Sequence, residues 1–363
     1  MISGKQLTRL TAALIFSTAI LYLPSISLKE SGNGGWASPL LSMLIGIIVV
    51  IVIYQLHRDY PQKTFAEYLP QVVGNTGAKI FGILYVIFFW DSGLDVVREI
   101  MAVVHATLLP QTPLIMVCLT IVMAIAYGLH CGLESIARVM EYVSFSMIAI
   151  PIILVLGVMG SIHINAFFPM FDKGWLGVAR GAFVPSSWYG EVLLMSFLLP
   201  FVVEQEKVLS SLFLGLMVTT VISIIITGLI IGVMGTGEAA RTQFVTYEVM
   251  RYVQLGDFLQ HIDALFLIPW LLLMLIKGIL FFYVTAVSFA QTIGVSRHEL
   301  VVLPLVLLSA VISHWFFRDE FIIGQFLEIV WPNYSLIFEL VIPLMLLCVH
   351  LIRKGFSKGK VAS

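Results

Sequence analysis

The chain has 363 residues and a net charge of −1; 60% of its residues are hydrophobic and only 11% are charged, against roughly 25% charged residues in soluble domains. This composition excludes a soluble globular domain, and the lack of a basic excess argues against a nucleic-acid partner. Apolar runs recur along the whole sequence, and a helix needs about 20 apolar residues to cross a membrane. We therefore expect an all-α polytopic membrane protein.

The first apolar run follows Lys5 and Arg9, as in a signal peptide, but it ends in YLPSIS (residues 22–27) without a small-x-small cleavage site. We expect this run to be retained as the first of about ten transmembrane helices. The ten apolar windows are Leu7–Ile26, Ala37–Leu56, Lys79–Leu108, Leu114–Tyr127, Glu141–Gly160, Val184–Val203, Leu209–Met234, Ala264–Gln291, Val301–Phe317 and Ser335–Ile352.

The basic residues predict the orientation, because Lys and Arg are enriched in cytoplasmic loops. With the N-terminus inside, twelve lie in inner segments: Lys5, Arg9, Arg58, Lys63, Lys79, Arg138, Lys207, Arg297, Arg353, Lys354, Lys358 and Lys360. Six lie outside: Lys29, Lys173, Arg180, Arg241, Arg251 and Arg318. Both termini should therefore be cytoplasmic, including a short basic tail at residues 353–363.

A break near Lys173 separates five windows from five, and an odd number per half gives the halves opposite orientations. That is the condition for an inverted-topology repeat, whose binding site lies near mid-membrane between discontinuous helices. We expect a single integral membrane domain over residues 1–363, with five-helix repeats at 7–160 and 184–352. Spans one and six should then be discontinuous.

Two polar stretches mark where these breaks are expected. Span one has Ser17 and Thr18 at its middle, and span six opens PSSWYGE (residues 185–191). Unwound backbone is tolerated only where it lines a polar cavity, and a half-helix N-terminus there would attract a carboxylate. With Glu191 to receive an ammonium, a zwitterionic amino acid suits the site. The alternative is that Gly190 only allows close helix packing.

The stretch FFWDSGLDVVREI (residues 88–100) carries four charges inside an apolar window. At about 100° per residue, Asp91, Asp95 and Arg98 lie within roughly 60° of one another, with Glu99 at the margin. They should face the bundle interior. We interpret Asp95 and Arg98 as a structural ion pair. Asp91 has no local partner and is the better ligand or proton candidate, unless a water-filled vestibule merely solvates it.

Lys277 lies near the centre of span eight, where a buried ammonium must be paired or neutral. In five-plus-five carriers a cation site commonly lies between the first and eighth helices. Two roles are therefore open for Lys277. It could replace a coupling ion or carry a proton, or it could be a structural counter-ion to Asp91 or Glu191. Glu339, in span ten, has no assigned role.

Enzymatic and metal-binding functions have no support in the sequence. Cys118, Cys131 and Cys348 lack CxxC spacing, and the histidines are not at metal-ligand spacing. GTGEAA (residues 235–240) follows a membrane helix rather than a strand, so it is not a nucleotide fingerprint. We expect no enzyme, no metal and no cofactor.

Four phrases together resemble the B-subunit family of bacterial spore germinant receptors, in order and spacing over essentially the whole chain. They are GNGGWAS (Gly32–Ser38), RDYPQKTFAEYLPQVVG (Arg58–Gly74), LLPQTP (Leu108–Pro113) and YGLHCGLESIARVMEY (Tyr127–Tyr142). The YGE of residues 189–191 is similar to the phenylalanine-glycine-phenylalanine-glutamate type of motif of amino-acid permeases.

The resemblance implies a relative of the amino acid–polyamine–organocation carriers, with their five-plus-five fold, in the inner membrane of the dormant spore. Such subunits act with a membrane-anchored A subunit and a C-subunit lipoprotein to sense nutrients such as amino acids, and binding triggers ion release. The implied pocket lies between spans one, three, six and eight. Its candidate residues are Ser17, Thr18, Asp91, Leu94, Ser187, Trp188, Tyr189, Gly190 and Glu191.

Three functions remain open at this point. The first is a nutrient-binding subunit that signals through its partners, and the second is an amino-acid permease working by alternating access. The third is an assembly subunit with a vestigial pocket. Span five lacks the lysine of proton-coupled carriers, and Lys277 is the candidate to replace it if it is not a structural counter-ion. Trp90, Trp188 and Tyr189 favour a ligand with an apolar or aromatic side chain.

Overall fold

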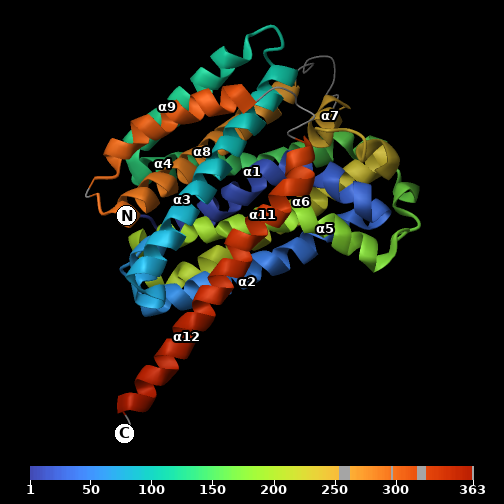
Figure 1. The fold of residues 1–363 in the computed structure, drawn as a ribbon. Helices are drawn as coiled ribbons and strands as arrows, with labels where there is room; N and C mark the ends of the chain where they lie inside the picture. The colour runs from blue at the N-terminus through green and yellow to red at the C-terminus, as the bar shows by residue number, and fades with distance from the viewer. Residues whose placement is uncertain (253–261, 296, 317–323, 362–363) are drawn as a thin grey trace.

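The computed structural model describes residues 1–252, 262–295, 297–316 and 324–361 (Figure 1). Apart from an isolated bridge between Ile2 and Val202, the regular structure of these residues is helical. Six helical stretches in them are long and apolar enough to cross a membrane. The all-α, multi-pass membrane class expected from composition is therefore confirmed.

The first half of the chain contains long helices joined by short connections. They are α1 (Gly4–Ser31), the 3₁₀-helix η1 (Gly32–Ala37), α2 (Ser38–Asp59), α3 (Phe65–Thr107) and α4 (Leu114–Val158). Window four and all but the last two residues of window five lie in α4, and Gly132 separates the two windows with a φ of 79°. Only glycine adopts this conformation readily, because it has no Cβ. The kink therefore marks the boundary between the two windows.

The second half begins with short 3₁₀ turns and is interrupted more often. Its elements are η2 (Met159–Ser161), η3 (Ile164–Phe167), α5 (Gly174–Gly190), η4 (Glu191–Phe197), η5 (Leu199–Phe201), η6 (Gln205–Lys207), α6 (Val208–Ala239), α7 (Val245–Tyr252), α8 (Ile262–Ile293), α9 (Glu299–Phe316), η7 (Phe326–Val330), α11 (Trp331–Leu336), η8 (Ile337–Val341) and α12 (Ile342–Val361). Each of the ten windows falls on one or more of the helices in the two halves. Phe317, the last residue of the ninth window, lies outside the described residues.

The expected break in span one is absent, since α1 keeps helical geometry over all 28 of its residues. The segment IFSTAIL at its middle contains neither glycine nor proline. The Ser17 hydroxyl donates to the Leu14 carbonyl within the same helix at 3.3 Å. The side chain therefore finds a partner while the helix continues, and the polar pair does not require an unwound backbone.

Span six changes helix type instead of unwinding. The α-helix α5 ends at Gly190, and the chain continues directly into the 3₁₀-helix η4 at Glu191, with helical dihedrals at both residues. A 3₁₀-helix has fewer residues per turn and poorer hydrogen-bond geometry than an α-helix, and long 3₁₀ runs often mark functional segments. The junction at Gly190–Glu191 thus lies where the sequence placed the break.

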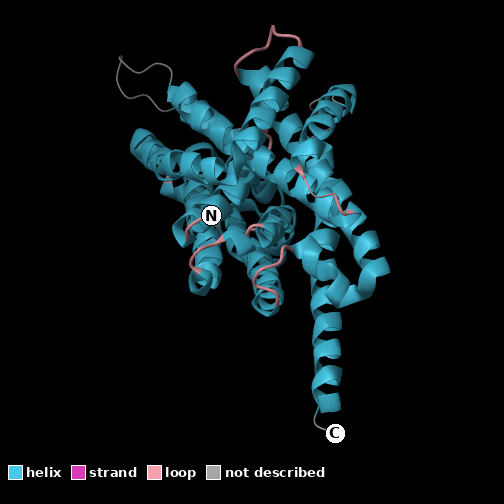
Figure 2. Cartoon of the chain, turned by 90° about the vertical axis from the view of Figure 1, so that its left-hand side faces the viewer, coloured by secondary structure: helices cyan, strands magenta, loops and turns pink. Residues whose placement is uncertain are grey.

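Helix α1 occupies the centre of the bundle and packs against α5, α6 and α8, while α3 packs along α8. Figures 1 and 2 show α12 running out of the bundle towards the C-terminus. The centre of α1 is almost completely buried. Polar side chains from α1, α3, α8 and η4 can therefore meet only inside the protein.

Candidate functional site

The four charged residues in the stretch 88–100 of α3 line one cavity of about 590 Å³. Asp91, Asp95, Arg98 and Glu99 share one side of the helix, as the helical period predicts. The remaining lining comes from α3, α9 and the η7–α11 segment and is mostly apolar: Ile87, Trp90, Leu94, Ile312, Phe326, Leu327 and Tyr334. The cavity therefore combines charges of both signs with an apolar and aromatic wall, as small-molecule sites do.

Two of the four charges neutralise each other. Arg98 Nη1 donates to Asp95 Oδ1 at 2.6 Å, and the side chains are 15% and 7% exposed. Asp91 lines the same cavity, but it makes no hydrogen bond or ion pair with any other described residue. Asp91 is thus a carboxylate of the cavity wall without a hydrogen-bond or ion-pair partner among the described residues.

Lys277, in α8, joins two other segments at the centre of the bundle. Its Nζ lies 2.8 Å from the Thr18 hydroxyl of α1, and 2.9 and 2.8 Å from the two carboxylate oxygens of Glu191. Lys277 is 1% exposed and Glu191 3% exposed. Of the two counter-ions considered from the sequence, the structure therefore pairs Lys277 with Glu191 and not with Asp91.

Glu99 connects this buried ion pair to the cavity. The Thr18 hydroxyl donates to Glu99 Oε2 at 3.0 Å while it accepts the hydrogen bond from Lys277. Glu99 also lines the cavity of α3. The sequence analysis placed Glu99 at the margin of the charged face and assigned it no role. Its position four residues after Asp95 was the signal that could have indicated a place in the site.

Ser17 enters the site through its backbone. The indole N–H of Trp270, in α8, donates to the Ser17 carbonyl at 2.8 Å, next to the Thr18–Lys277 contact. The Ser17 side chain stays within its own helix, bonded to Leu14. Ser17 therefore supports the packing of α1 on α8 and does not reach the cavity.

The other candidates from span six lie in the packed core. Ser187 donates to the Val184 carbonyl at 2.7 Å, Tyr189 shares a 2.9 Å hydrogen bond with Thr220 of α6, and Trp188 is 1% exposed. None of these side chains lines the cavity of α3. In this arrangement the structure brings Glu191 to the polar centre but keeps Ser187, Trp188 and Tyr189 away from it.

Gly190 lies against Glu339 of the last span. A Cβ built on Gly190 would collide with the carboxyl and Cβ of Glu339. Glu339 is completely buried and sits in the π-helical turn η8, a geometry often found at functional sites. The sequence left Glu339 unassigned; a single acid in SLIFELVIPL was the signal that would have found it.

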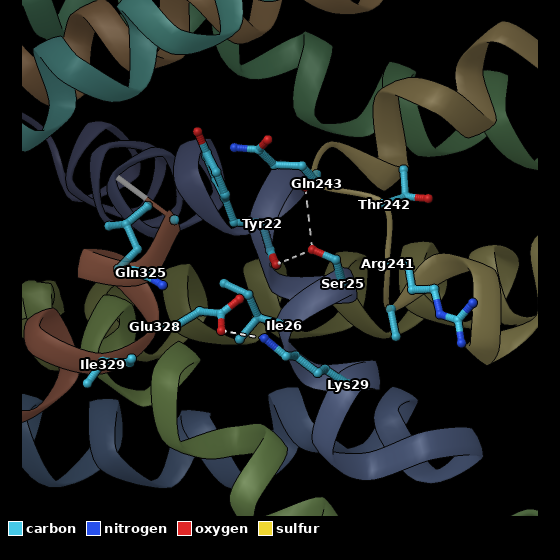
Figure 3. A pocket seen from close by; sticks show the side chains of 13 residues that line it. Tyr22, Ser25, Ile26, Lys29, Arg241, Thr242, Gln243, Gln325, Glu328 and Ile329 are labelled. Carbon is cyan, nitrogen blue, oxygen red and sulfur yellow. Dashed lines mark hydrogen bonds and ion pairs between the residues drawn. The ribbon is translucent and has the colours of Figure 1, made fainter. Parts of the chain in front are cut away.

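A second cavity, of about 430 Å³, opens beside the C-terminal end of α1. Figure 3 shows Lys29 and Glu328 meeting across it, with the two charged atoms 2.6 Å apart, and the Ser25 hydroxyl directed at the carbonyls of Tyr22 and Gln243. Leu327 lines both cavities. The second cavity therefore adjoins the first, with Leu327 between them.

The fold is that of membrane transporters. The structure aligns with Mhp1, a nucleobase–cation symporter solved closed with bromovinylhydantoin bound, with a TM-score of 0.66, 14% identity, and coverage of 93% of this chain and 76% of that chain. It also aligns with a Na⁺-coupled sialic acid symporter, with a TM-score of 0.67, 10% identity, and coverage of 93% and 78%.

The chain belongs to the spore germination protein (spore permease) family, whose model matches residues 1–322. It is 22% identical to spore germination protein KB of Bacillus subtilis (strain 168) over 99% of this chain and 98% of the relative. It is 23% identical to spore germination protein YndE of the same organism over 80% of each. These relatives are spore germination proteins and not enzymes.

Proposed function

We propose that this chain is the nutrient-binding membrane subunit of a spore germinant receptor. The observation that carries the proposal is the cavity of about 590 Å³ beside α3, in a chain of the spore germination family. Asp91 would receive an ammonium and Arg98 a carboxylate. Trp90, Phe326 and Tyr334 would hold an apolar side chain, so a small amino acid fits the chemistry of the lining.

Signalling follows from the connection between the cavity and the bundle centre. A ligand shifts a conformational equilibrium only through its differential affinity for the two states. Glu99 lines the cavity and bonds to Thr18, which contacts Lys277. A ligand that alters the position of Glu99 therefore acts on α1, α8 and η4 together. In our proposal, an A-type membrane subunit and a C-type lipoprotein in the inner spore membrane respond to the resulting arrangement of α1, α8 and η4.

The sequence candidates divide into two groups under this proposal. Asp91 and Leu94 contact the ligand directly, while Thr18, Glu191 and Lys277 transmit its effect. Ser17, Ser187, Trp188, Tyr189 and Gly190 act by positioning the helices in the present arrangement. A five-plus-five inverted repeat, with cytoplasmic termini, is the architecture in which we place these roles.

The experiment is nutrient-triggered germination of spores carrying the wild-type chain or Asp91→Asn, with a panel of single amino acids and sugars. Loss of a charged hydrogen bond worth about 1.5–3 kcal/mol should raise the half-maximal nutrient concentration more than about tenfold. Glu206→Gln, at an exposed residue of η6 just before α6, is the control for the change of charge. Subunit levels are measured in all spores.

Two other outcomes identify the alternative functions. Uptake of the labelled nutrient into vesicles, dependent on an ion gradient, would show a permease working by alternating access. An unchanged dose curve for every nutrient in Asp91→Asn spores, with the partner subunits present at normal levels, would favour the assembly role and would contradict a nutrient site beside α3.

A further inference from the structure

Glu339 is a buried carboxyl group without a hydrogen-bond partner among the described residues. Its side chain is completely buried, and neither carboxyl oxygen makes a hydrogen bond within the described part of the chain. It lies against Gly190, the last residue before Glu191. Transfer of an isolated carboxylate to such surroundings costs so much free energy that the group becomes neutral instead. An ionised Glu339 would therefore need a counter-charge.

Among the described residues, the charged groups around Glu339 do not provide a free counter-charge. From α8, Lys277 is already paired with Glu191 of η4, and both interact electrostatically with Glu339. A further carboxylate, that of Glu99 on α3, accepts a hydrogen bond from the Thr18 hydroxyl. Tyr85, also on α3, donates its hydroxyl proton to the Phe338 carbonyl at 2.8 Å, beside Glu339. With three carboxylates around one ammonium, full ionisation would leave two buried negative charges uncompensated.

We propose that Glu99, Glu191 and Glu339 form a buried proton-holding site around Lys277, in which Glu339 carries a proton in the arrangement seen here. The geometry also provides an entrance, because Glu99 lines the cavity beside α3 and is linked to Lys277 by the Thr18 hydroxyl. The site is independent of which nutrient, if any, the cavity binds.

Transfer of the proton would change the helix contacts. If an O–H bond breaks at Glu339 and one forms on the Glu191 carboxylate, total charge is conserved and Glu191 becomes neutral. The ion pair that ties α8 to η4 is then lost, and Lys277 turns to the remaining carboxylates. Movement of a single proton from Glu339 to Glu191 therefore replaces the ion pair between α8 and η4 by a contact of Lys277 with another carboxylate.

The test is infrared spectroscopy of the purified full-length protein in lipid nanodiscs, without nutrient, at neutral pH. A protonated carboxyl has a C=O stretch that shifts in D₂O. We expect this band in the wild type and its loss in Glu339→Gln. It should persist in the control Glu238→Gln, which removes an exposed acid near the end of α6. Absence of the band in the wild type, or its full retention in Glu339→Gln, would overturn the proposal.

A sodium titration separates a proton from an alkali cation and needs no variant. Choline chloride is replaced stepwise by sodium chloride at constant ionic strength, and then by potassium chloride. The proton site predicts an unchanged band, whereas a band that disappears as the cation is added would assign the position to that cation.

Should Glu339→Gln fail to fold, Lys277→Met serves instead. It should gain a protonated carboxyl band, because Glu191 loses its counter-ion, and no gain would contradict the site.

Discussion

Lys277 has two kinds of contact at the level of the single side chain. It forms an ion pair with Glu191 and a hydrogen bond with Thr18, and it is 1% exposed. A buried ion pair adds little to stability relative to apolar packing, because desolvation opposes the attraction of the charges. Removal of one partner, however, leaves the other charge buried and unpaired. The pair therefore need not add to stability, and in our proposal it serves the response to ligand.

Lys277→Met should lower the free energy of unfolding by about 3 kcal/mol, the lower end of the range for breaking a buried pair, since the freed carboxyl can take up a proton. Thermal melting in detergent measures this. The double variant Lys277→Met/Glu191→Gln should recover part of the loss, because both charges are gone. Lys207→Met, at an exposed ion pair with Glu204, is the control and should melt like the wild type. A wild-type melting temperature for Lys277→Met would contradict the pairing.

At the level of the element, changes in helix type place the acidic side chains. Helix α5 passes into a 3₁₀-helix at Glu191, and the helical stretch Phe326–Gly355 contains two π-helical turns, with Glu339 in the second. A π turn is wider than an α turn and a 3₁₀ turn is tighter. The two irregular segments meet where Gly190 contacts Glu339. A Cβ at position 190 would meet the Glu339 carboxyl, so a larger residue there requires the Glu339 side chain to shift.

Gly190→Ala should therefore displace Glu339 or separate the two segments, with the protein still made and inserted. We expect a weakened germination response at a normal protein level, together with a lower melting temperature. Gly228→Ala in α6 is the matched control, because a Cβ there meets no other atom, and alanine favours the helix by roughly 0.5–1 kcal/mol. Equal dose curves for the two variants would rule out the Gly190–Glu339 contact as part of the response.

At the level of the whole molecule, six of the polar contacts between distant segments, apart from those at the buried centre, fall into two groups. One group joins segments predicted to be inner, and its pairs are Met1–Glu134, Arg9–Glu141, His57–Gln205 and Asp59–Lys354. The other joins segments predicted to be outer, through Lys29–Glu328 and the bond from Lys173 to the Lys29 carbonyl. This grouping agrees with helices that alternate in direction and place both termini on one side.

The orientation predicted from the basic residues is tested with a reporter that fluoresces only in the cytoplasm. Fusions at the N-terminus and at the C-terminus should both fluoresce, because twelve of the basic residues lie on that side. A fusion after Lys173, in the predicted outer loop, should be dark. Fluorescence of the Lys173 fusion together with dark terminal fusions would reverse the orientation, and a difference between the two termini would disprove an even number of spans.

The sequence by itself determined the membrane class, the positions of the helices and the inward face of α3, because hydrophobicity and the helical period are local properties of a segment. It also located Glu191 and Lys277 as special positions, since a charge in an apolar window must have a partner. Only the tertiary structure decided which partner. Lys277 meets Glu191, 86 residues away, and Thr18, 259 residues away. The contact of Gly190 with Glu339, the cavity beside α3 and the unbroken course of α1 also arise from packing between distant segments, which no local pattern contains.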